Sequence, residues 1–201
     1  MKSKVLENKK IKEEKLMNSA LELFSEKDIQ DVTIQDIVNK AGVAKGTFYL
    51  YFKDKYQIQN ALIHKESTKL FKEARNKCNE SQITDFIEKT LFMIDQVLLT
   101  LESNPFMLRF IKRSLSWGVF QNQINAVMDE NEFNILEEFR KDTIASNYHF
   151  DNPDITLYLI IEMVGSTCYT SIMYNQPTSI HNLKPYLYDA IRAILQQGKI
   201  E

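Results

Sequence analysis

The sequence contains few of the residues that interrupt helices or cross-link chains. Its 201 residues include five glycines, four prolines and two cysteines, whereas 44% of them are hydrophobic and 26% are charged. Because few helix-breaking residues interrupt segments rich in Leu, Ile, Glu and Lys, we expect an all-α protein. Cys78 and Cys168 are isolated in the sequence, which argues against a disulfide framework and fits a reducing compartment.

Targeting and membrane signals are also lacking. No apolar run approaches the ~20 residues that a membrane-spanning helix needs. The N-terminus is rich in lysine, but it has no apolar segment followed by a small-residue cleavage site, and it therefore differs from a signal peptide. We expect a cytoplasmic protein that does not bind membranes.

The residue patterns that carry catalysis are missing as well. His64, His149 and His181 are far apart in the sequence, and neither cysteine has a companion at metal-ligand spacing. There is no glycine-rich phosphate loop, no G-x-S-x-G and no H-E-x-x-H. We therefore expect no enzyme activity, no catalytic residue, no metal site and no cofactor.

The overall charge does not indicate a nucleic-acid partner, because the net charge is -2 and the pI is about 6.0. Residues 1–60 nevertheless hold eleven lysines against nine acidic residues, a local charge of +2. Six of these lysines crowd the first 15 positions: Lys2, Lys4, Lys9, Lys10, Lys12 and Lys15. Positive charge near phosphate adds affinity, so this asymmetry supports DNA binding when a motif accompanies it.

Residues 33–55, TIQDIVNKAGVAKGTFYLYFKDK, predict two short helices joined by a tight turn. Thr33 precedes an apolar-periodic run, and Asp36 lies three residues later, where its carboxylate can cap the helix. Gly42 ends the run, at a position where glycine takes the left-handed conformation without steric cost. A second helix follows from Ala44 to Phe52.

The side chains of this second helix divide between two faces. Phe48 and Phe52 are four residues apart, so they share one face and can pack on the first helix. The other faces carry polar side chains and a glycine, which together suit the major groove of DNA. These residues are Lys45, Gly46, Thr47, Tyr49 and Tyr51.

Apolar periodicity predicts helices along the rest of the chain. We expect a charged arm over 1–8, followed by helices over 9–27, from Asp54 to about 77, from a cap at Ser81 to Asn104, from 106 to about 117, over 119–146, over 155–174, and from a cap near Asn182 to Gly198.

The pattern resembles the N-terminal domain of TetR-family transcriptional regulators over residues 11–62. The matching features are a helix that ends in Phe24, T-I-Q-D-I-V, the A-G-V turn and K-G-T-F-Y-L-Y-F-K-D-K. Two positions depart from the family pattern. Ala44 stands where the family usually has a serine that caps the recognition helix and reaches a phosphate, and Asp28 replaces a glycine.

The resemblance implies two domains and a regulatory function. Residues 1–53 would form a three-helix helix-turn-helix DNA-binding domain, and residues 54–201 a helical effector-binding and dimerisation domain. The implied function is that of a homodimeric repressor, released from a palindromic double-stranded DNA operator by a small hydrophobic or aromatic effector.

The DNA-contacting residues would be Thr33, Gln35, Ala44, Lys45, Gly46, Thr47, Tyr49, Tyr51 and Lys55. Chemistry agrees, because lysine, glutamine and hydroxyl groups pair with base edges and phosphates. Packing against the fourth helix is the alternative for Tyr49 and Tyr51.

The last two helices are where the resemblance places the dimer interface. Residues 155–174 are apolar nearly all round, which indicates burial on more than one side. Their small residues form a narrow seam that allows close helix approach. The interface residues expected on this basis are Ile161, Gly165, Cys168, Ile172, Leu187, Ile191, Ile194 and Leu195.

An effector site in the second domain is implied by the resemblance alone. The candidates are Phe86, Met93, Phe110, Arg113, Trp117, Phe120, Tyr158 and Glu162. A carboxylate on so apolar a helix is costly unless it is paired, which singles out Glu162 with Tyr158, four residues before it. Glu162 could instead pair with Arg113 or lie at a solvated edge of the dimer, and the apolar candidates could belong to the core.

Two other functions stay open at this point. A DNA-binding regulator controlled by a protein partner would carry the same motif. An enzyme or carrier could use the helical second domain, although no sequence motif favours it.

Overall fold

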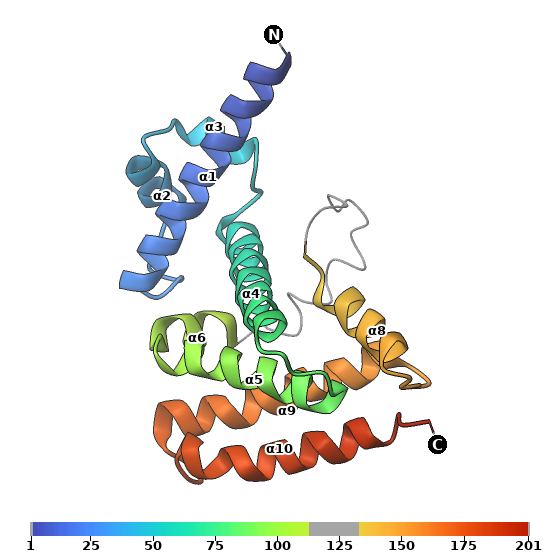
Figure 1. Ribbon diagram of the computed structural model, residues 1–201. Helices are drawn as coiled ribbons and strands as arrows, with labels where there is room; N and C mark the ends of the chain where they lie inside the picture. Colours follow the sequence, from blue (N-terminus) through green and yellow to red (C-terminus); the bar gives the residue numbers. More distant parts are fainter. Residues whose placement is uncertain (1, 113–132, 201) are drawn as a thin grey trace. The chain divides into compact units, whose positions relative to one another are not determined.

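The computed structural model describes residues 2–112 and 133–200, with side chains over 7–111 and 133–200 (Figure 1). Every regular element in these residues is an α-helix, which confirms the predicted all-α class. Contacts divide the chain into two compact units, residues 1–63 and 64–201, which we call the N-terminal and C-terminal units. The division falls inside α4 (Lys55–Glu80), whereas the sequence predicted a boundary at the start of that helix.

Three helices and the start of α4 form the N-terminal unit. α1 (Lys2–Glu26) packs mainly on α2 (Ile34–Ala41), and α3 (Lys45–Tyr49) follows after a short turn (Figure 1). The arm predicted over residues 1–8 is wrong, because α1 already begins at Lys2. No glycine or proline precedes Gly42, and lysine is a good helix former, so nothing in these residues stops the helix. The core contains Leu16, Ala20, Phe24, Val32, Ile37, Val38, Phe48, Phe52, Ile58 and Leu62.

α4 begins in the N-terminal unit and ends in the C-terminal unit. Asp54 caps it as predicted, since its Oδ1 accepts hydrogen bonds from the backbone N–H groups of Tyr56 and Gln57 at 2.9 and 2.8 Å. The helix runs without a break to Glu80. The two units are therefore connected by continuous helix.

The C-terminal unit is built around α9. Its other described helices are α5 (Phe86–Glu102), α6 (Pro105–Lys112), α8 (Ile135–Ala145) and α10 (Ile180–Gln196). α9 (Pro153–Tyr174) packs against all four of them (Figure 1). Asn152 caps α9 by accepting from the Ile155 N–H at 3.1 Å, with Pro153 in the first turn as the sequence predicted.

Three predicted helix starts in this unit are wrong. Ser81 does not cap α5, because its hydroxyl donates to the Cys78 carbonyl at 2.7 Å and closes α4 instead, while Asp85 caps α5. The helix predicted from 119 cannot run unbroken to 146, because Asn134 caps α8, and its earlier part lies outside the described residues. α10 begins one turn early, capped by Ser179. In each case several polar residues that can cap lie close together, so spacing alone cannot choose between them.

Among the described helices, α9 alone is long and apolar enough to cross a membrane, judged by length and composition. No apolar run of that length was expected from the sequence. Its position accounts for that composition, because Leu157, Ile160, Ile161, Val164 and Cys168 are buried within the C-terminal unit. An apolar helix in contact with four others needs apolar residues on several sides.

Candidate nucleic-acid interface and cavity

The turn that presents α3 is fixed by local hydrogen bonds. Thr33 Oγ1 accepts from the Asp36 N–H at 3.1 Å, and Asp36 Oδ2 accepts from the Thr33 N–H at 2.9 Å and the Thr33 hydroxyl at 2.6 Å. The hydroxyl and backbone bonds from Thr33 hold the pKa of the Asp36 carboxyl below its ordinary value. Gly42 closes α2 in the left-handed conformation with φ of +66°, which confirms both predicted ends of this helix.

α3 is held to the unit by its phenylalanines. Phe48 is fully buried, and its ring centroid lies 5.8 Å from that of Phe52, so the predicted apolar face is confirmed. Ala44 precedes the helix without a side-chain cap. The orientation of α3 therefore depends on packing rather than on capping.

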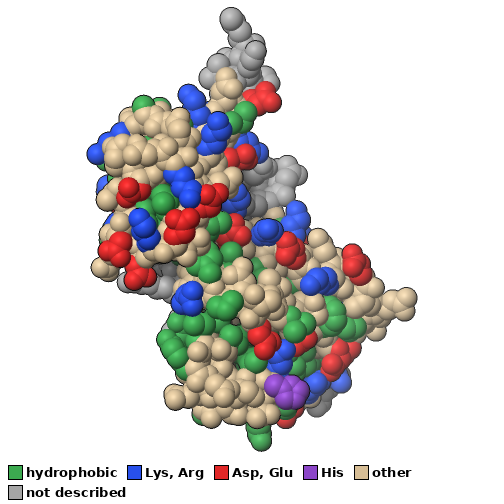
Figure 2. Space-filling model, turned by 90° about the vertical axis from the view of Figure 1, so that its left-hand side faces the viewer, with side chains coloured by type: hydrophobic (Ala, Val, Ile, Leu, Met, Phe, Trp, Pro, Cys, Tyr) green, Lys and Arg blue, Asp and Glu red, His purple; other side chains and the backbone are tan. Residues whose placement is uncertain are grey.

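The opposite side of α3 is open to solvent. Lys45 and Gly46 are exposed, Tyr49 is 53% exposed, and Thr47 is half-buried. A Cβ placed on Gly46 would meet no atom within 4 Å, so the packing of the unit does not require glycine there. Figure 2 shows basic and acidic side chains interspersed over the visible face of this unit.

Leu50 is an exposed residue of this surface that sequence reasoning missed. It follows α3 directly and is 75% exposed, which is unusual for a leucine. The sequence contained a signal for this exposure. Leu50 is two positions after the buried Phe48, and two helical residues differ by about 200° around the axis, so Leu50 points away from the core. An apolar side chain here could contact a thymine methyl group.

Besides Thr33, three more of the predicted DNA-contacting side chains already have partners in the unit. Lys55 Nζ donates to the carbonyls of Gln30 and Val32 at 2.8 and 2.9 Å. The Tyr51 hydroxyl donates to the Lys9 carbonyl at 3.0 Å, so Tyr51 contacts α1, a neighbour that neither prediction for this residue named. Gln35 donates to Asn39 Oδ1 at 2.8 Å and stays exposed.

The C-terminal unit encloses an apolar cavity of about 70 Å³ between α4, α5, α8 and α9. Arg75 on α4 lines it and pairs with two carboxylates of α8: its Nη2 donates to Asp142 Oδ1 at 2.9 Å and lies 3.3 Å from Glu138 Oε2. The hydrogen bonds to Asp142 raise the pKa of the guanidinium. The apolar lining consists of Phe71, Met93, Ile94, Val97, Ile135, Phe139, Leu157, Ile160, Ile161 and Val164, with Thr90 beside them.

Among the predicted effector residues that the structure describes, Met93 lines this cavity, and Phe86, Phe110, Tyr158 and Glu162 do not. Phe86 packs in an aromatic cluster, 4.6 Å from the Tyr148 ring, and Phe110 stacks on Phe106 at 5.5 Å. Tyr158 and Glu162 are exposed on α9 and do not line this cavity. The remaining candidates lie outside the described residues: Arg113, Trp117 and Phe120.

The predicted dimer seam faces inward in a single chain. Ile161 lines the cavity, Gly165, Ile172 and Ile194 are half-buried, and the other four are buried: Cys168, Leu187, Ile191 and Leu195. Burial raises the pKa of the Cys168 thiol to about 11. The buried residues of this set pack α9 and α10 into their own unit, whereas Gly165, Ile172 and Ile194 remain partly exposed. The helical spacing of apolar residues predicted this apolar stripe correctly. It does not determine whether the stripe packs against helices of the same chain or of a partner.

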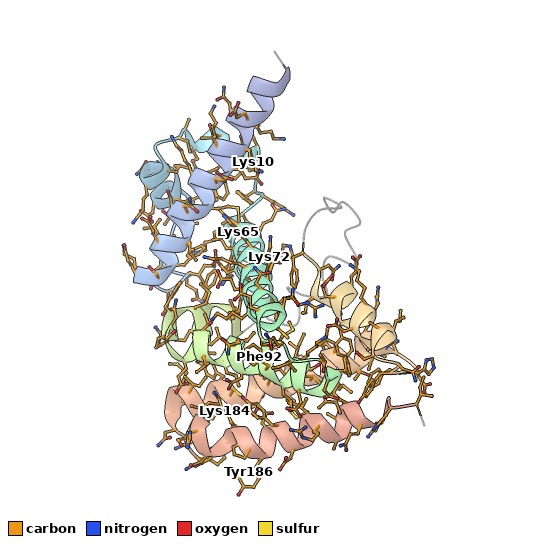
Figure 3. The ribbon with its side chains drawn as sticks, viewed as in Figure 1. Lys10, Lys65, Lys72, Phe92, Lys184 and Tyr186 are labelled. Carbon is orange, nitrogen blue, oxygen red and sulfur yellow. The ribbon has the colours of Figure 1, made fainter. Side chains whose placement is uncertain are left out.

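A different apolar surface remains on the last two helices. It consists of Ile155 at 56% exposure, Tyr158 at 42%, Leu159 at 51% and Tyr186 at 76%. Tyr186 projects away from α10 (Figure 3). We call these four residues the exposed α9–α10 face.

Known proteins resemble the chain in two ways. The sequence profile of the bacterial regulatory proteins of the tetR family matches residues 16–62. An uncharacterized HTH-type transcriptional regulator of Bacillus subtilis, YvdT, is 35% identical over 91 residues, which is 45% of this chain and 46% of that protein. The chain spans about half the length of YvdT and of an uncharacterized HTH-type transcriptional regulator of Mycobacterium tuberculosis that it also matches.

Solved structures resemble the chain over nearly its whole length. A TetR-family transcriptional regulator from Streptomyces coelicolor matches 93% of this chain and 99% of its own, with a TM-score of 0.66 and 12% identity. The regulator FadR from Bacillus subtilis, solved in complex with stearoyl-CoA, matches 88% of this chain and 96% of its own, with a TM-score of 0.57 and 18% identity. These likenesses establish the fold. In its N-terminal sequence and in its overall fold, the chain is similar to bacterial regulatory proteins of the TetR family.

Proposed function

We propose that this protein is a sequence-specific DNA-binding transcriptional regulator, whose α3 enters the major groove of an operator. The observation that carries the proposal is the open surface of α3 around Gly46. Glycine in a helix costs up to about 1 kcal/mol relative to alanine, and nothing inside the unit needs the missing methyl group. Close approach of an external partner explains it, and the exposed Lys45 and Tyr49 beside it supply donors for bases and phosphates.

The protein acts in this proposal as a homodimer in the cytoplasm, with the exposed α9–α10 face between the protomers. Ile155, Tyr158 and Leu159 are exposed apolar neighbours on α9 by helix spacing, and exposed apolar surface of this kind is typical of a protein interface. A symmetric dimer presents two copies of α3 to a palindromic site, with half-sites about 34 Å apart or a multiple of that distance. Sedimentation equilibrium tests this step: Leu159→Glu should shift the protein to monomer, and an unchanged dimer would place the interface elsewhere.

A small, largely apolar effector would bind the cavity and release the repressor. The cavity touches α4 through Phe71 and Arg75, and the same helix holds Gln30 and Val32 through Lys55. A ligand that binds one arrangement of α4 more tightly than another would therefore change the affinity for DNA. The size of that change is limited by the ratio of the ligand's affinities for the two arrangements. At about 70 Å³ the cavity is well below the ~300–1,000 Å³ of ordinary ligand pockets. A stearoyl chain, as bound by FadR of Bacillus subtilis, would have to widen it considerably.

A thermal-shift panel of small apolar compounds tests the effector step. An effector stabilises the fold by mass action and should also weaken DNA binding. If no compound does both, control by a protein partner becomes the better explanation.

The main claim is tested with Thr47→Ala combined with Tyr49→Ala. The probe is a duplex selected from a random pool by the wild-type protein, and affinity is measured by fluorescence anisotropy. Hydrogen bonds to charged groups contribute about 1.5–3 kcal/mol each, so the affinity should fall by at least about 100-fold. Circular dichroism and sedimentation should show the fold and dimer unchanged. Equal affinity of the variant and the wild type for the selected duplex would refute DNA recognition by α3.

A further inference from the structure

The N-terminal half of α1 lies directly beside the segment that follows α3. The Tyr51 hydroxyl donates to the Lys9 carbonyl at 3.0 Å, and the Lys9 ammonium lies 6.0 Å from the centroid of the Tyr51 ring. Tyr51 is only partly exposed because of this contact. The contact fixes where the start of α1 stands relative to α3, within one compact unit.

The lysines of this half of α1 whose side chains the structure describes form no ion pair with a described acidic group, in contrast to the lysine that faces the other half. Lys40 on α2 pairs with Glu22 at 3.0 Å and Glu26 at 3.4 Å, near the C-terminal end of α1. Among the described side chains, no acidic group forms an ion pair with the four exposed lysines of the N-terminal half, which are Lys9, Lys10, Lys12 and Lys15. Lys10 lies on α1 at the level of α3 (Figure 3).

The backbone of α1 continues past Lys9 toward the N-terminus. α1 begins at Lys2, so seven residues of helix, about 10 Å, continue beyond Lys9. The major groove is about 12 Å wide and is bordered by phosphates on both sides. The Lys9 ammonium lies about 6 Å from Tyr51, which follows α3 closely in the sequence. When α3 occupies the groove, Lys9 is therefore close to one of the two rows of phosphates that border it.

We infer that the N-terminal half of α1, around Lys9 and Lys10, is a second DNA-contacting element that binds backbone phosphates beside the groove occupied by α3. The inference rests on the proposed function. Tyr51 has a positioning role in it, because its hydroxyl holds α1 in place and does not contact DNA itself. This element adds affinity for any sequence, and α3 supplies the discrimination between sequences.

The test is the salt dependence of binding, compared between Lys9→Gln/Lys10→Gln and the control Lys69→Gln/Lys72→Gln. The control removes the same charge from exposed positions on α4 in the C-terminal unit. Two duplexes are used: the one selected by the wild-type protein and one of unrelated sequence. Affinities are measured over about 50–300 mM KCl, and the slope of log K against log salt is compared. A folding defect lowers the active fraction without changing this slope.

The slope should become shallower by about 0.9 for each phosphate that the variant no longer neutralises, on both duplexes, while the control pair keeps the wild-type slope. A slope equal to that of the control pair would overturn the inference. A wild-type protein that selects no duplex from the random pool at low salt would instead overturn the proposed function. The two failures are thus distinguishable.

Discussion

Gly46 and Gly198 show how differently the two units use the same kind of residue. A methyl group on Gly46, in α3, would meet no atom within 4 Å, whereas one on Gly198, just after α10, would lie 2.3 Å from Cζ of Phe150. The first glycine leaves room for something outside the protein, and the second leaves room for a neighbouring ring. An alanine at each position should therefore have opposite effects on the free energy of unfolding.

Charged side chains follow the same division. In the N-terminal unit, Lys9 forms no ion pair with the described residues, and Lys45 is likewise exposed and unpaired within them. In the C-terminal unit, Arg75 is bound to Asp142 and Glu138, and Lys184 to Asp95 at 2.7 Å. Exposed lysines without an ion pair among the described residues therefore lie near α3, whereas Arg75 and Lys184 link helices of the C-terminal unit.

The largest effect on stability is expected for Gly198→Ala. The Phe150 ring cannot move freely, because it stacks on Tyr148 at 6.5 Å and packs 6.2 Å from Phe139. Overpacking of this kind costs about 1–3 kcal/mol, and we expect about 2 in urea unfolding. Phe150→Leu should recover part of this loss when it is combined with Gly198→Ala. A stability of the single variant equal to wild type would mean that the chain end relaxes freely, and the contrast with Gly46 would fail.

Asp95→Asn should have a smaller, pH-dependent effect. Asp95 Oδ1 accepts from Lys184 Nζ at 2.7 Å and from the Tyr188 hydroxyl at 2.6 Å. Burial alone would raise the pKa of this carboxyl, but the bonds from Lys184 and Tyr188 outweigh burial and lower the pKa. The side chain is 34% exposed, so the loss near neutral pH should be only about 1 kcal/mol.

The sign of the pH dependence follows from the lowered pKa. A carboxyl with a folded-state pKa below its unfolded value of ~3.9 contributes stability above that value, and loses it as the pH falls through the folded-state pKa. Urea unfolding at pH 7, 5, 4 and 3 should therefore give a difference between wild type and variant that shrinks below about pH 4. A difference that stays constant over this series would mean that packing, and not the charge, stabilises this contact.

The N-terminal unit could be predicted in detail because its signals are local. The capping box of Thr33 with Asp36 and the left-handed Gly42 each involve residues within a few positions of each other. Spacing along the chain therefore determines them, and the structure agrees. What sequence could not supply were the long-range contacts, such as Lys55 with Gln30 and Tyr51 with Lys9, which depend on how the helices pack.

The C-terminal unit was predictable as helical but not in its sites. The seam of Ile161 and Cys168 was recognised as buried, yet the same periodicity fits burial against a partner or within the unit. The cavity brings Arg75 of α4 into contact with Glu138 and Asp142 of α8. These helices are more than 50 residues apart in the sequence, and no local sequence pattern predicts a contact over such a separation. Glu162 looked costly on an apolar helix, but it is exposed.

The smallest effect on stability is expected for Gly46→Ala, and it is also the most informative. Alanine is favoured over glycine in a helix, and the new methyl group would meet no atom of the unit, so stability should rise by about 0.5 kcal/mol. DNA affinity should fall by at least about 10-fold, because the methyl group occupies the space that close approach to the duplex requires. Gly42→Ala is the matched control: its φ of +66° disfavours alanine, so this variant should lose stability instead. Thermal unfolding and anisotropy with the selected duplex measure both quantities. A Gly46→Ala protein that gains stability and keeps its DNA affinity would show that the open surface of α3 is not kept free for DNA.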